Sequence, residues 1–195
     1  MKRGSNRSIR LTLNAPVTLA FAALCLAALL LNVVTAGHSN SMFFITYHSS
    51  LKDPLTYLRF FTHVLGHGGW QHFMSNMTYL LLLGPILEEK YGPKVMLQII
   101  VITALVTSIT HYILFPKVGL CGASGVVFAF ILLASFTSVK SGEIPVTFIL
   151  VAVIFLGQQI WDGIFKSDDI SNLTHILGGV VGSAVGFALA KKKRR

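Results

Sequence analysis

The chain has 195 residues, of which 53% are hydrophobic and only 12% are charged, and its mean hydropathy is +0.70. An ordinary soluble domain carries about 25% charged residues, so this composition excludes a soluble domain that covers its own surface. The net charge is +9. Because the basic residues flank apolar segments and form no basic face with aromatic neighbours, they argue against nucleic-acid binding and for orientation in a membrane.

Apolar stretches that reach or approach the length needed to cross a bilayer recur along the chain. They lie at residues 16–36, 71–88, 93–115, 124–139, 144–162 and 172–190. Because lipid offers no partner to open backbone groups, each stretch is predicted to be a helix. The first stretch follows basic residues as a signal peptide does, but it is too long for the apolar region of one. We interpret it as a retained span.

The predicted architecture is therefore an all-α membrane protein with six transmembrane helices. An even number of spans places both termini on one side, and with both in the cytoplasm twelve of the sixteen Lys and Arg residues fall on the cytoplasmic side. We accordingly expect a basic cytoplasmic N-terminus at 1–14, one transmembrane domain at 15–190 and a basic cytoplasmic tail at 191–195.

The connection between the first two predicted spans, residues 37–70, is long and mixes polar with aromatic residues. This mixture indicates a segment at the membrane interface, and a loop of this length in a compact domain is usually functional. His63 and His67 are spaced like metal ligands on a helix, but no carboxylate or further ligand accompanies them as in HExxH. We therefore predict neither a metal site nor a cofactor.

Polar groups inside spans are costly, so each needs a physical reason. His72 and Asn76 are four residues apart at the start of the second span and therefore share one helix face. Their imidazole and amide can donate hydrogen bonds to a developing negative charge, or they can make an ordinary polar contact between helices. The two residues alone leave both interpretations open.

Ser124 stands at the start of the fourth span in the sequence GASG, flanked by Gly122 and Gly125. A helix N-terminus favours negative charge and offers backbone N–H groups, and glycine lets another chain come close. This setting suits a nucleophile whose attack creates an oxyanion. A simple helix cap is the alternative for a serine at this position.

His175 lies near the start of the sixth span and is followed by a glycine stripe at Gly178, Gly179 and Gly182. The stripe predicts close packing on another helix, and a packing histidine is the alternative to a catalytic one. No carboxylate lies within one helical turn of His175, so the sequence indicates a Ser–His dyad and not a triad. Phe128, one turn after the serine, offers a ring on which the imidazole can stack.

Together these segments resemble the rhomboid family of intramembrane proteases, over about residues 58–190. Three ordered motifs carry the resemblance, and they are HxxxN at His72 and Asn76, GxSG at Gly122, Ser124 and Gly125, and HxxG at His175 and Gly178. The resemblance implies a six-helix rhomboid bundle of the minimal bacterial type with a long interfacial first loop.

The resemblance also implies a role for each matching residue. Ser124 would be the nucleophile and His175 its general base, while His72, Asn76 and the Ser124 backbone N–H would bind the oxyanion. The implied function is a serine endopeptidase that cleaves transmembrane segments near the outer face of a bacterial inner membrane. Transmembrane proteins would be its substrates and membrane lipids its surroundings.

Two further positions match structural residues of the family, and two depart from its pattern. Arg59 corresponds to the arginine of a first-loop Trp-Arg pair, and Glu88 to a glutamate near the cytoplasmic end of the second span. Leu58 replaces the tryptophan of that pair, and Phe128 stands where many members have tyrosine. Because Phe128 keeps the ring, activity is expected to survive.

Two other classes of protein are alternatives to a protease. A pseudoprotease that binds transmembrane clients without cutting them is the main alternative, and the presence of both Ser124 and His175 disfavours it. A small transporter or channel would predict inverted repeats or interrupted helices at mid-membrane, and the sequence contains neither pattern.

Overall fold

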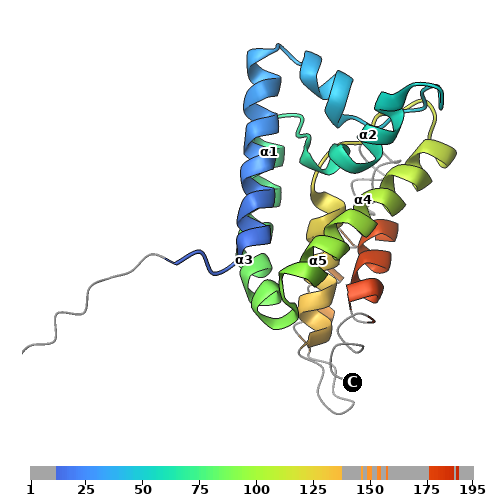
Figure 1. Cartoon of the computed structure of the whole chain (residues 1–195). Helices are drawn as coiled ribbons and strands as arrows, with labels where there is room; N and C mark the ends of the chain where they lie inside the picture. The colour runs from blue at the N-terminus through green and yellow to red at the C-terminus, as the bar shows by residue number, and fades with distance from the viewer. Residues whose placement is uncertain are drawn as a thin grey trace, which may run out of the picture.

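The computed structural model describes residues 12–137, 146, 149–150, 153–154, 157, 176–186 and 188. Its elements in chain order are α1 (Pro16–Val34), the π-helical turn η1 (Asn40–Phe44), α2 (Pro54–Thr62), the 3-10 turn η2 (His63–Leu65), α3 (Trp70–Tyr91), α4 (Pro93–Leu114) and α5 (Ser124–Thr137) (Figure 1). A further helical segment covers Ile176–Gly186. No strand occurs within the described residues, so the all-α prediction is confirmed there. Most of the predicted fifth span lies outside them, and the count of six spans stays a prediction.

Two of the described helices are long and apolar enough to cross a membrane by length and composition, and these are α1 with 19 residues and α4 with 22. The helical stretches Ser124–Ser135 and Ile176–Gly186 are apolar but shorter. α3 also has 22 residues, but it carries His72 and Asn76 near its start and Glu88 near its end. Of these residues Asn76 and Glu88 are buried, so at these positions α3 faces the protein interior and not the lipid.

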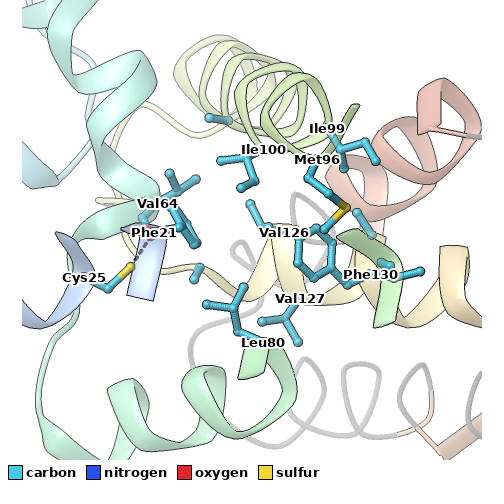
Figure 2. Packing of buried hydrophobic residues seen from close by; sticks show 14 of the residues in the cluster. Phe21, Cys25, Val64, Leu80, Met96, Ile99, Ile100, Val126, Val127 and Phe130 are labelled. Atoms are coloured by element: carbon cyan, nitrogen blue, oxygen red, sulfur yellow. Dashed lines mark hydrogen bonds between the residues drawn. The ribbon is translucent and has the colours of Figure 1, made fainter. Parts of the chain in front are cut away.

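α5 is the most deeply buried of the helices. Every side chain from Val126 to Phe130 is at most 2% exposed, as expected for a helix that is apolar on all sides. Figure 2 shows its residues Val126, Val127 and Phe130 within a cluster that also contains Phe21 of α1, Leu80 of α3 and Met96, Ile99 and Ile100 of α4. The helix that begins at Ser124 is thus held mainly between α3 and α4.

Arg59 of α2 organises the first loop. The residue is 3% exposed, and its guanidinium donates hydrogen bonds to the Met42 carbonyl at 3.0 Å, the Ser49 hydroxyl at 3.2 Å and the Asp53 carboxylate at 3.2 Å. It also lies over the Tyr47 ring at 4.6 Å. A buried charge is tolerated when it is paired and hydrogen-bonded in this way. One arginine therefore ties together a stretch of chain with little regular structure.

The first loop also pairs with the segment that leads into α5. Thr46 and Leu120 exchange two backbone hydrogen bonds of 2.9 and 2.8 Å in an isolated antiparallel bridge. The Thr46 hydroxyl in turn donates to the Arg59 carbonyl at 2.9 Å. Leu58, where the rhomboid pattern has tryptophan, is 43% exposed and lies on the outer side of α2. The loop is thus anchored through its backbone and Arg59, while position 58 stays at the surface.

Glu88 joins the end of α3 to the start of α1. The residue is 3% exposed, and its carboxylate accepts hydrogen bonds from the backbone N–H groups of Val17 and Thr18, both at 2.9 Å, and from the Thr18 hydroxyl at 2.8 Å. Negative charge is favourable at a helix N-terminus, where the N–H groups have no partner within the helix. One turn before Glu88, a Cβ on Gly84 would overlap the Thr18 side chain, so the glycine permits this contact.

Replacing Glu88 with alanine should therefore loosen α1 from α3. The change removes three hydrogen bonds to a carboxylate, and a single such bond contributes about 1.5–3 kcal/mol, so we expect the free energy of unfolding to fall by about 3 kcal/mol or more. Chemical unfolding in detergent micelles measures the change. Glu89→Ala, at the exposed neighbouring position, is the matched control and should shift stability by no more than about 0.5 kcal/mol. Equal losses in the two variants would contradict the capping role.

Candidate active site

The site is built around the turn from Gly122 into α5. Gly122 has φ of +126°, a backbone conformation that side-chain-bearing residues rarely adopt. Its N–H donates to the His63 carbonyl at 2.9 Å. Two residues later Ser124 opens α5 and is half-buried. The sequence expectation that Ser124 stands at a helix start therefore matches its position in the fold.

The His72 ring lies directly against this turn. A Cβ built on Gly122 would stand 2.7 Å from both Cε1 and Nε2 of His72 and 3.6 Å from the Ser124 hydroxyl oxygen. The space beside Gly122 is therefore bordered by an imidazole edge from α3 and by the serine from α5. Like Ser124, His72 is half-buried. Two of the residues that the sequence singled out are thus brought together from segments about fifty positions apart.

Asn76 follows His72 by one turn of α3 and is 5% exposed. Its side-chain nitrogen Nδ2 is buried and donates to no acceptor among the described residues. A buried amide without an acceptor costs free energy of about 1–3 kcal/mol. Such a donor is suited to an acceptor that is supplied only during binding or reaction. The structure places Asn76 on the helix that carries His72, as the four-residue spacing predicts.

The glycines of the helical segment Ile176–Gly186 lie where this segment approaches α4 and α5. A Cβ on Gly178 would overlap Thr107, one on Gly179 would overlap the Phe128 ring, and one on Gly182 would overlap Thr103. Figure 1 shows Ile176–Gly186 alongside these two helices. His175 itself lies outside the described residues, so its distance from Ser124 stays a prediction. Phe128, which is 1% exposed, contacts the segment one turn beyond position 175.

Two first-loop histidines near this site, His63 and His67, are buried and neutral at physiological pH. Burial lowers the pKa of His63 to about 4, and the Arg59 backbone carbonyl partly opposes this shift because it favours the protonated ring. Burial, and then the charge of His72, lower the pKa of His67 to about 4 as well. His63 lies 3.1 Å from the Thr107 hydroxyl through Nε2. The two histidines do not share one helix, and no group of three potential metal ligands occurs within the described part of the chain.

Sequence reasoning missed the polar stripe of α4. Thr103, Thr107 and His111 are four residues apart in turn and at most 2% exposed. His111, which had no assigned role, lies 2.8 Å from the Val118 carbonyl through Nε2. The spacing rule that selected His72 and Asn76 applies equally to this stripe. The sequence alone does not mark the stripe as unusual, because threonine is tolerated in spans when its hydroxyl bonds to its own helix, as that of Thr107 does to the Thr103 carbonyl at 2.8 Å.

Comparison with known proteins identifies the family to which the chain is similar. Residues 54–192 match the model of the Rhomboid domain family. The chain is 29% identical over 179 residues to "Rhomboid protease GlpG" of Enterobacter sp. (strain 638), a match that covers 89% of this chain and 63% of that protein. It is 26% identical over 176 residues to the proteins of the same name from Yersinia pestis (strain Pestoides F) and Yersinia pseudotuberculosis serotype O:3 (strain YPIII), with 88% and 62% covered in each case. The chain thus spans less than two thirds of the length of these curated relatives.

Gly122→Ala tests the turn at the centre of the site. An alanine at this φ costs about 1–3 kcal/mol of backbone strain, and its methyl group would in addition displace the His72 ring. We expect a loss of at least about 2 kcal/mol in the free energy of unfolding. Gly68→Ala is the control, because a Cβ on Gly68 meets no atom within 4 Å. Stability equal to that of the unmodified chain in Gly122→Ala would contradict the strained turn.

The buried histidines predict a loss of stability in acid. Unfolded histidines protonate near pH 6.5, whereas His63 does so only near pH 4 in the folded protein. The unfolded state therefore binds more protons between these values, and stability falls as the pH is lowered through this window, by about 3 kcal/mol for one such group. In His63→Gln the melting temperature should fall less between pH 7 and 4.5. His38→Gln, at an exposed position, should keep the original slope, and equal slopes in all three proteins would refute the assignment.

Proposed function

This chain belongs to the rhomboid family, and from that premise we propose that it is an intramembrane serine endopeptidase. It cleaves transmembrane segments of membrane proteins near the outer face of a bacterial cell membrane, with both of its own termini in the cytoplasm. The observation that carries the proposal is the position of Ser124 at the start of a buried helix, with the His72 ring beside it across Gly122. A hydroxyl and hydrogen-bond donors that border one space are what acyl transfer requires.

The proposed reaction uses Ser124 and His175 as a dyad. The Ser124 oxygen attacks the carbonyl carbon of the scissile peptide bond while its proton passes to His175. The C–N bond then breaks, and His175 returns the proton to the departing amine. Water, deprotonated by His175, attacks the resulting ester, releases the new carboxyl group and restores the serine hydroxyl. Each proton taken up by the imidazole is given back, so no further reactant is needed.

The oxyanion of both tetrahedral intermediates is proposed to be bound by His72, Asn76 and the Ser124 backbone N–H. The position of the Cε1–Nε2 edge of His72 at Gly122 supports this role, as does the buried Asn76 amide without an acceptor among the described residues. Ser124 is the first residue of α5, so the helix dipole favours negative charge at that point. Donors fixed in advance contribute most to such catalysis because they need not reorganise.

The membrane setting limits which substrates can react. An intact transmembrane helix shields its carbonyl groups by internal hydrogen bonds, so a substrate must unwind locally before Ser124 can reach one. Segments with small or helix-breaking residues near the cut meet this requirement at lower cost. Water must also reach the site, which favours a position near the outer surface. Phe128, packed against Gly179, supports the proposed stacking of the His175 ring one turn earlier.

Cleavage of a model transmembrane substrate in proteoliposomes tests the dyad. We expect Ser124→Ala and His175→Ala each to reduce kcat by about 10⁴-fold or more, as removal of a catalytic unit does in other serine proteases. Ser135→Ala is the matched control, because Ser135 lies in the same helix and bonds only to the Ile131 carbonyl among the described residues. It should cleave at the unmodified rate.

Two outcomes would reject the proposal. Cleavage by either dyad variant at the rate of the Ser135→Ala control would show that Ser124 or His175 takes no part in the chemistry. Stable binding of the substrate by the unmodified protein with no cleavage at all would instead support the pseudoprotease alternative. Fluorescence of a cleavable reporter and co-purification of an uncleaved client separate these two results.

A further inference from the structure

His67 is a fully buried residue that the proposed reaction does not use. Its side chain is 0% exposed, and its ring centroid lies 5.0 Å from that of His72 in an edge-to-face arrangement. Its ring also packs at 5.4 Å against Phe73, the next residue of α3. The His72 ring therefore has contact with His67 in addition to the contact of its Cε1–Nε2 edge with Gly122.

The hydrogen bond of His67 fixes its form. Nδ1 lies 3.0 Å from the Leu65 carbonyl, which only accepts, so Nδ1 carries the proton. Burial keeps the pKa of His67 low, at about 4, so the ring is neutral at physiological pH. A neutral histidine protonated at Nδ1 has no proton on Nε2. The neighbour of His72 is thus a neutral ring of fixed tautomer, and it cannot repel positive charge on His72.

The backbone around His67 is also held in place. Its carbonyl accepts a hydrogen bond of 2.9 Å from the Asn40 side chain, and the Asn40 N–H donates to the Asn32 side chain near the end of α1 at 3.3 Å. Gly66 admits the Phe44 backbone so closely that a Cβ would come within 2.5 Å of the Phe44 oxygen. His67 is therefore attached to the first loop and to α1, and not only to the helix that it precedes.

We propose that His67 is a positioning residue for His72: its ring, oriented by the Leu65 carbonyl on a backbone that the Asn40 amide holds, keeps the His72 imidazole against Gly122 in the orientation that binds the oxyanion. This inference rests on the proposed function. A donor that is displaced by a fraction of an ångström loses much of its effect on the transition state. The first loop thereby contributes to catalysis through the contact between the His67 and His72 rings and not through contact with substrate.

A double-mutant cycle tests this inference with the full chain in proteoliposomes. His67→Asn keeps a donor for the Leu65 carbonyl but removes the ring. We expect kcat to fall by about tenfold to a hundredfold with KM changed less than twofold, because only the oxyanion interaction is affected. His67→Phe keeps a neutral ring but lacks the hydrogen bond to the Leu65 carbonyl, so it should regain part of the lost kcat. His72→Ala alone should retain about a hundredth to a thousandth of kcat, which leaves a measurable rate.

The cycle separates positioning from a general structural role. If His67 acts through His72, adding His67→Asn or His67→Phe to His72→Ala changes kcat by less than about twofold. Melting temperatures identify any variant that fails to fold. If His67→Asn or His67→Phe fails, kcat is compared with the other of these two substitutions. Equal losses of kcat in both backgrounds, or a raised KM with kcat unchanged, would overturn the inference. Absence of cleavage by the unmodified protein would overturn the proposed function first, and the inference with it.

Discussion

The candidate site depends on one constraint, which is that residue 122 is a glycine and has no side chain. The start of α3 and the start of α5 approach each other at this residue, and the His72 ring occupies the space that a Cβ would fill. The backbone there has a positive φ, which glycine adopts at little cost. A larger residue would separate the imidazole from the serine and strain the turn into α5. Glycine therefore sets the distance between the proposed nucleophile and one proposed oxyanion donor.

The remainder of the described fold keeps these two helix starts in place. α5 is buried on all sides, so Ser124 cannot move without disturbing the cluster that Figure 2 shows. Glu88 ties α3 to α1 at the opposite end of α3 from His72. The first loop bonds to the segment before α5 through Thr46 and through the His63 carbonyl. Side-chain packing and the hydrogen bonds at the helix ends thus both hold α3 and α5 in place.

The sequence predicted the features that depend on local spacing. The first and third spans were placed within about two residues of α1 and α4, because long apolar runs in a membrane protein must be helices. The shared face of His72 and Asn76 follows from the period of the helix, and the position of Ser124 follows from GASG at an apolar boundary. These inferences need no knowledge of how the helices are arranged in space.

Contacts between distant segments were not predictable in this way. Glu88 bonds to residues about seventy positions away, and Arg59 bonds to the carbonyl of Met42, a group that every residue possesses. No local pattern marks a carbonyl as a partner. The internal structure of the first loop and the contact between His67 and His72 depend on such pairings. Spacing could identify the polar residues, but it could not show which of them touch.

The most direct test of the account is to identify the residue that a fluorophosphonate modifies. This reagent forms a covalent bond with a serine whose oxygen is an activated nucleophile. Mass spectrometry of the digested, labelled protein should find the adduct on Ser124 and none on Ser135, which lies in the same helix. An adduct on another serine, or an unmodified Ser124 in protein that cleaves its substrate, would contradict the claim that Ser124 is the nucleophile.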